Sequence, residues 1–197
     1  MFKSLILPLF LIVPASALAN GCPNAQTAKQ GFVLERKGTK AEVRRASDHF
    51  VHVTNLYPGG MKQDVIYYKG LLPISRFDDT TQSISIPVSD IRTIFPLTLK
   101  TRRAVTYAPA SPRTVRDLVS LELTVTDEEE IELGACTYEV LAVHHRYMNA
   151  EGRTTSEHTD LYSPALGFVL AKRYPEKGGR HTLMQYQSIK PLERAPF

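Results

Sequence analysis

The chain has 197 residues and is mildly basic, with 24 lysines and arginines against 20 acidic residues. So small an excess of positive charge does not indicate a nucleic-acid-binding protein. Thirteen prolines, nine tyrosines and no tryptophan favour strands with frequent turns over a helical bundle.

Residues 1–19 have the pattern of a secretory signal peptide. Lys3 gives a positive start, residues 5–13 form a short apolar run, and Ala17-Leu18-Ala19 is a small-residue cleavage site. The apolar run is too short for a transmembrane helix, and prolines interrupt it. We therefore expect cleavage after Ala19, a periplasmic location, and no transmembrane segment in the exported chain.

The sequence has two cysteines, Cys22 and Cys136. Export places them in an oxidising compartment, so we expect a disulfide between them. Their wide spacing indicates a structural link, because a redox-active pair favours close spacing such as C-x-x-C. Lipidation of Cys22 is the alternative, although the residues before it lack the usual order of leucine and small residues.

From residue 20 to residue 197 we expect one β domain. Alternating apolar and polar residues, divided by glycine and proline turns about every ten residues, are typical of an antiparallel sheet. A helical turn capped at Ser89-Asp90 is expected through Ile94, a break at 70–73, a loop at 108–113, and an acidic hairpin turn or edge at 127–130. The predicted strands are 31–36, 40–45, 50–57, 63–69, 82–86, 97–107, 115–126, 135–147, 153–161, 168–174 and 181–189.

The strand at 135–147 is expected at the centre of the sheet. Alternation places Cys136, Tyr138 and Val140 on one face and Leu141 and Val143 on the other, so neither face is purely polar. This pattern suits a strand covered on both sides to different extents. The fold class expected is all-β: a single, strongly curved antiparallel sheet, half-barrel or barrel-like, with one disulfide.

Residues 94–174 resemble a β domain found in exported bacterial proteins of unknown role. The matching phrases are Phe95-Pro96-Leu97, the segment 131–140, and Tyr162-Ser163-Pro164-Ala165-Leu166-Gly167 before a strand. Cys136 departs from that pattern, because an aromatic residue usually stands there. More loosely, the architecture is similar to curved-sheet envelope proteins, the lipoprotein-carrier half-barrels and the disulfide-bearing β-spiral proteins. The resemblance implies a β fold and a role in the cell envelope, and it implies no catalytic residue.

The histidines do not form a recognisable metal motif. His144 and His145 point to opposite sides of a strand, although one of them could meet His158 or His52 across strands at the distance of zinc ligands. No H-E-x-x-H or cysteine–histidine cluster supports such a site. We expect no metal and no cofactor.

Residue types of a hydrolytic triad occur near residue 160. His158 and Asp160 stand close to Ser156 and Ser163, but no G-x-S-x-G phrase provides a nucleophile elbow. We expect no catalytic residue, and hence a protein that is not an enzyme.

Basic residues interleaved with tyrosines are the best candidates for contact with a ligand or partner. Such residues could bind anionic lipid, glycan or an acidic envelope protein, although they are also ordinary outward positions of a sheet. Pairs of basic residues at 44–45, 102–103 and 172–173 and the tyrosines at 57, 67, 68, 107 and 174 belong to this group. The candidates are Arg44, Arg45, Arg102, Arg103, Tyr57, Tyr107, His144 and Arg173.

The sequence favours a non-enzymatic periplasmic binding or envelope-associated protein that acts through its curved sheet. The first alternative is a carrier of a lipid or other apolar ligand, which requires an apolar pocket. Its expected lining is Phe32, Phe50, Leu141, Phe168 and Met184. The second alternative is an exported hydrolase, with His158 or His144 beside a carboxylate and a nucleophile.

Overall fold

A computed structural model describes residues 21–193. The predicted signal peptide lies outside the described residues. No helix within 21–193 is both long and apolar enough to cross a membrane.

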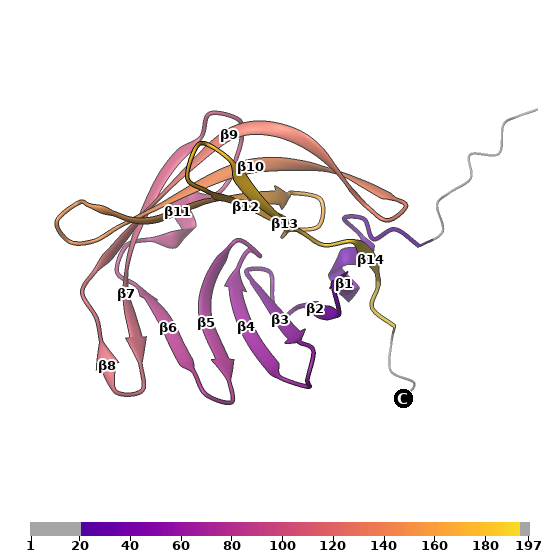
Figure 1. The fold of residues 1–197 in the computed structure, drawn as a ribbon, viewed down its shortest axis with the longest axis horizontal. Coiled ribbons are helices and arrows are strands. Elements are labelled where there is room, and N and C mark those ends of the chain that lie inside the picture. Colours follow the sequence, from indigo (N-terminus) through magenta and orange to yellow (C-terminus); the bar gives the residue numbers. More distant parts are fainter. Residues whose placement is uncertain (1–20, 194–197) are drawn as a thin grey trace, which may run out of the picture.

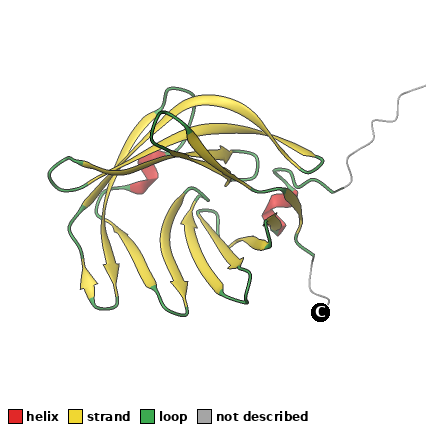
Figure 2. Cartoon of the chain, viewed as in Figure 1, coloured by secondary structure: helices red, strands yellow, loops and turns green. Residues whose placement is uncertain are grey.

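The described chain is almost entirely antiparallel β-sheet, as expected, with two short 3-10 helices (Figures 1 and 2). The helices are η1 (Thr27–Gln30) and η2 (Ile91–Ile94), and Asp90 caps η2 by accepting a hydrogen bond from the Arg92 N–H. The strands are β1 (Phe32–Arg36), β2 (Thr39–Arg45), β3 (Phe50–Leu56), β4 (Lys62–Tyr68), β5 (Leu72–Asp78), β6 (Gln82–Pro87), β7 (Arg102–Ser111), β8 (Thr114–Val115), β9 (Val119–Leu133), β10 (Cys136–Met148), β11 (Thr154–Ser163), β12 (Phe168–Pro175), β13 (His181–Gln185) and β14 (Ser188–Pro191).

The strands form one curved sheet of 14 strands, in the order β13-β12-β11-β10-β9-β7-β6-β5-β4-β3-β2-β1-β14, with β8 paired to β7. The long strands β9 and β10 arch above the shorter strands β2–β8 in Figure 1. Two residues, Tyr186 and Gln187, connect the two end strands β13 and β14. The Tyr186 N–H donates to the Leu170 carbonyl and the Gln187 N–H to the Glu35 carbonyl, so this connection brings the two ends of the sheet together.

Strand β10 was expected at the centre of the sheet but is the fourth strand from the β13 end, and it packs on both sides. Tyr138, Val140 and Ala142 belong to a core cluster with Phe32 and Leu34 of β1. Leu141 and Val143 belong to a second cluster that includes residues of β5, β7 and η2. Burying apolar surface on both faces fixes the curvature of the sheet around this strand.

The expected disulfide is confirmed: Cys22 and Cys136 are bonded, and it ties the segment before β1 to the start of β10. The Tyr138 hydroxyl also donates to the Pro23 carbonyl at 3.0 Å. Both interactions attach the N-terminal segment to the same strand.

Several expected boundaries were wrong. The strand expected at 97–107 begins at Arg102, and the one expected at 115–126 runs from Val119 to Leu133. The break at 70–73 ends early, because β5 begins at Leu72 and accommodates Pro73 beside a bulge in its pairing with β4. The acidic segment 127–130 lies inside β9, where each residue pairs with one on β10. The loop expected at 108–113 is partly strand, since β7 begins at Arg102 and continues to Ser111.

Candidate functional site

The predicted contact residues do not gather on one surface. Arg44 pairs with Glu42 on β2, and Arg45 lies beside Gly167. Arg102 pairs with Glu122. These contacts are those of ordinary side chains on a sheet surface.

The other candidates are also dispersed. Arg103 donates to the carbonyl of Arg102, and His144 lies 3.8 Å from a carboxylate oxygen of Glu157. Arg173 forms an ion pair with Glu129. The two tyrosines line cavities: Tyr107 an apolar pocket, and Tyr57 a polar cavity.

The polar cavity lies between the first strands of the sheet and β12–β13, and its volume is about 220 Å³. Its apolar side chains come from β12 and β13 and are Phe168, Val169, Ala171 and Met184. We call it the tyrosine–arginine cavity. Its polar lining consists of Arg36, Thr39, Asn55, Tyr57, Gln63, Tyr67, Arg76, Lys172, Tyr174 and Tyr186.

Strand alternation explains how polar side chains reach this cavity. On β3, Val51, Val53 and Asn55 share a face, and the two valines are core residues. Asn55 pairs directly with Gln63 of β4, as Val53 does with Val65. The core-facing side of these strands is therefore apolar at one end and polar at the other.

Two arginines on the cavity wall have no carboxylate partner. Arg36 continues the core-facing side of β1, and Arg76 stands opposite the buried Val65 in the pairing of β4 with β5. Neither forms an ion pair within residues 21–193, where the paired arginines are Arg44, Arg92, Arg102, Arg146, Arg153 and Arg173. The two guanidinium groups are free to bind an anion, and their planar fork suits a carboxylate or a phosphate.

Tyrosines beside these arginines remain un-ionised. Burial raises the pKa of Tyr186 to about 12 against the opposing effect of Arg36. Burial likewise raises the pKa of Tyr67 above its usual range, and Arg76 opposes the shift. At neutral pH each hydroxyl can both donate and accept a hydrogen bond.

Gln63 is held in place by its neighbours. Its amide oxygen accepts a hydrogen bond from the Tyr57 hydroxyl at 3.3 Å, and its amide nitrogen donates to Asp78 at 3.3 Å. Hydrogen bonds from Thr80 and Gln63 lower the pKa of Asp78 to about 2, so this carboxylate is ionised at neutral pH. Asp78 is thus a negative charge that accepts a hydrogen bond from the amide of Gln63.

The third cation of the cavity, Lys172, is paired. Its ammonium donates to an oxygen of Asp160 at 2.7 Å, and the two residues stand directly opposite each other on β11 and β12. Asp160 is fully buried. Burial alone would raise the pKa of Asp160, but Lys172, His145 and His158 outweigh it and hold that pKa below its usual range.

Behind this ion pair lie two stacked histidines. His145 and His158 stand opposite each other on β10 and β11, with ring centroids 4.7 Å apart and planes 18° from parallel. His158 Nε2 is 3.2 Å and His145 Nε2 is 3.4 Å from an oxygen of Asp160. Sequence reasoning considered a meeting of one of the paired histidines with His158, and the structure brings His145 there.

These three residues are the ones that could hold a metal, since their ligand atoms lie within 4.8 Å of one another. Two features oppose metal binding by these residues. The lone pairs of stacked imidazoles run side by side and do not converge on one point, and the Lys172 ammonium already occupies Asp160. The cluster is better described as a buried ion pair packed against two stacked imidazoles.

His145 is expected to make stability depend on pH. It is 1% exposed, neither ring nitrogen has a hydrogen-bond partner, and burial lowers its pKa to about 3. Between pH 6.5 and pH 3 the unfolded chain binds a proton that the folded protein excludes, so stability falls as the pH falls, by up to about 1.4 kcal/mol per unit. His145→Phe should flatten this slope in urea unfolding between pH 6.5 and pH 4.5. An unchanged slope, or an equal flattening in the exposed-site control His181→Gln, would contradict the assignment.

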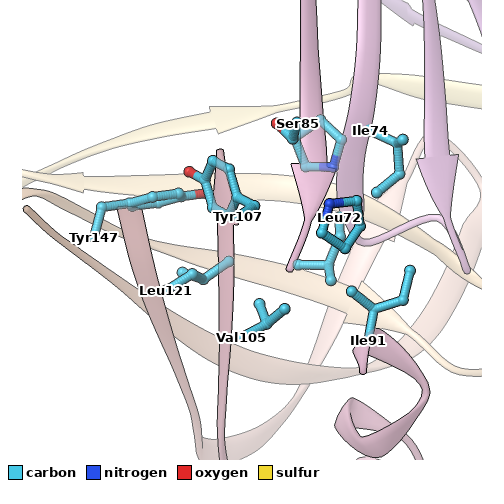
Figure 3. Close-up of a pocket in the computed structure, with 10 residues that line it drawn as sticks. Leu72, Ile74, Ser85, Ile91, Val105, Tyr107, Leu121 and Tyr147 are labelled. Atoms are coloured by element: carbon cyan, nitrogen blue, oxygen red, sulfur yellow. The ribbon is translucent and has the colours of Figure 1, made fainter. Parts of the chain in front are cut away.

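The five residues expected to line an apolar carrier do not share one pocket, although Phe168 and Met184 both line the tyrosine–arginine cavity. Phe32 and Phe168 contact each other in the core, Phe50 and Met184 are partly exposed, and Leu141 is buried in the second cluster. Figure 3 shows an apolar pocket, where Leu72, Ile74, Ile91, Val105 and Leu121 meet two tyrosines, Tyr107 and Tyr147. Its volume is about 60 Å³, well below the roughly 300 Å³ typical of a pocket for a drug-sized ligand.

The triad residues are placed without a nucleophile in position. His158 and Asp160 are neighbours, but Ser163 is fully buried and its hydroxyl oxygen accepts the Leu166 N–H of the following turn. Ser156 is exposed and pairs with Tyr147 on β10. The arrangement provides a buried carboxylate and bases, and no serine beside them.

Comparison with known proteins shows a similarity to a solved structure and no match to a family. No protein-family model and no curated protein matches the chain. The crystal structure of the hypothetical lipoprotein YmcC from Escherichia coli (K12) is similar, with a TM-score of 0.49 and 10% sequence identity. The match covers 88% of this chain and 90% of YmcC.

Proposed function

We propose that this is an exported, non-catalytic protein of the cell envelope that binds an anionic ligand in the tyrosine–arginine cavity. The observation that carries the proposal is the presence of Arg36 and Arg76 on the wall of one cavity, both without a carboxylate partner among residues 21–193. Unpaired guanidinium groups in a partly enclosed site attract a carboxylate or phosphate more strongly than the same groups in water. The secretory pattern of residues 1–19 and the disulfide support an exported location.

Neutralising the two arginines should remove binding of small anions. Titration calorimetry of the exported chain with citrate and with inorganic phosphate should show weak, salt-sensitive binding that Arg36→Gln and Arg76→Gln each reduce by tenfold or more. Arg44→Gln and Arg103→Gln remove a positive charge outside the cavity and provide the matched controls. Equal losses of affinity in all four variants would show that only the net charge of the protein matters. That result would contradict a binding site in the cavity.

A further inference from the structure

The tyrosine–arginine cavity offers more hydrogen-bonding groups than a simple anion would use. Besides the two free arginines, it presents hydroxyls of Tyr67, Tyr174 and Tyr186 and the amide of Asn55, none of which is hydrogen-bonded to another residue within 21–193. A compact anion would satisfy only the guanidinium groups. The remaining donors and acceptors are open to solvent and would be left to water, so they are available to a ligand that carries hydroxyls.

Tyrosine is also an aromatic surface with a polar tip. The rings of Tyr67 and Phe168 pack edge to face, with centroids 5.6 Å apart, and so form a fixed wall. Lys172 keeps further N–H donors after pairing with Asp160. A ligand that matches this lining has an acidic group, several hydroxyls and an apolar face of C–H groups that packs on an aromatic ring.

We infer that the ligand is an acidic sugar residue, a pyranose that carries a carboxylate or a phosphate, held with its acidic group between Arg36 and Arg76 and its hydroxyls toward the tyrosines and Asn55. The cavity volume of about 220 Å³ fits one such residue and not a long chain. Tyr174 and Met184 are partly exposed at the cavity, so the residue can be a free monosaccharide or the end of a glycan. This inference rests on the proposed function and specifies its ligand.

The test compares four probes on the exported chain by titration calorimetry: galacturonate, glucose 1-phosphate, galactose and citrate. We expect one of the two acidic sugars to bind at least tenfold more tightly than galactose, which lacks the charge, and than citrate, which lacks the ring. Which acidic sugar binds distinguishes a carboxylate from a phosphate. A uronate trisaccharide then distinguishes a glycan end from a free sugar by binding more tightly than the monosaccharide.

Two tyrosine variants separate this inference from the proposed function. Tyr67→Phe and Tyr186→Phe remove hydroxyls that accept or donate no hydrogen bond to a described residue. Each variant should weaken binding of the acidic sugar about fivefold and leave binding of citrate unchanged. Tyr107→Phe, in the apolar pocket, is the control. If citrate binds as tightly as the acidic sugars and the tyrosine variants change nothing, the sugar assignment is overturned while the anion site stands. If no probe binds, or if Arg36→Gln leaves binding intact, both are overturned.

Discussion

Replacing Asp160 with asparagine is expected to lower the free energy of unfolding by about 3 kcal/mol, the lower end of the range for breaking a buried ion pair. The change leaves the Lys172 ammonium without its counter-charge in a region where Asp160 is fully buried. We expect the lower end because Lys172 is 33% exposed and can turn toward the cavity. Urea unfolding at pH 7 measures the effect.

The control for this prediction replaces both charges. Asp160→Leu combined with Lys172→Met removes the pair without leaving an isolated charge, so it should recover most of the stability lost in Asp160→Asn. A double variant as unstable as the single one would show that packing, and not charge, accounts for the loss. Such a result would contradict our description of the cluster.

Removing the disulfide should have an effect of similar or greater size. Cys22 and Cys136 are separated by 114 residues, and closing a loop of that order restricts the unfolded chain by about 4 to 5 kcal/mol in the chain-entropy model. Cys22→Ser with Cys136→Ser should therefore lower the melting temperature markedly. The measurement is thermal unfolding of the double variant beside the oxidised protein.

Tyr138→Phe is the matched control for the disulfide. It removes the hydrogen bond to Pro23 and leaves the covalent link intact, so it should cost about 1 kcal/mol. If the double serine variant costs no more than Tyr138→Phe, the link contributes little. The N-terminal segment would then be held by its hydrogen bond and packing alone.

Local patterns were enough to predict the fold class and the strand β10, but not its place in the sheet, where it is the fourth strand from the β13 end. Alternation over 135–147 corresponds to β10, and the cysteine pairing followed from export and spacing. The errors have a common cause, because each concerns a segment whose neighbours outweigh its local composition. The acidic residues 127–130 resemble a turn, but their pairing with β10 holds them in a strand of 15 residues.

The site was harder to predict, although a signal existed. Asn55 and Gln63 stand at core-facing positions next to Val53 and Val65. Polar residues at such positions need hydrogen-bond partners or solvent, so they indicate that the apolar core ends there and a cavity begins. What the sequence could not show is that Lys172 lies at the cavity lined by Arg76, because that depends on the curvature of the whole sheet.

The most direct test of an anion site between Arg36 and Arg76 is NMR of their side-chain Nε–Hε groups in protein labelled with ¹⁵N-arginine. Arg36→Gln and Arg76→Gln assign the two signals by their loss. We predict that galacturonate, glucose 1-phosphate or citrate shifts both signals along one saturable curve, while signals of the paired arginines stay in place. Shifts confined to other arginines, or none with any of the three anions, would contradict the proposed function.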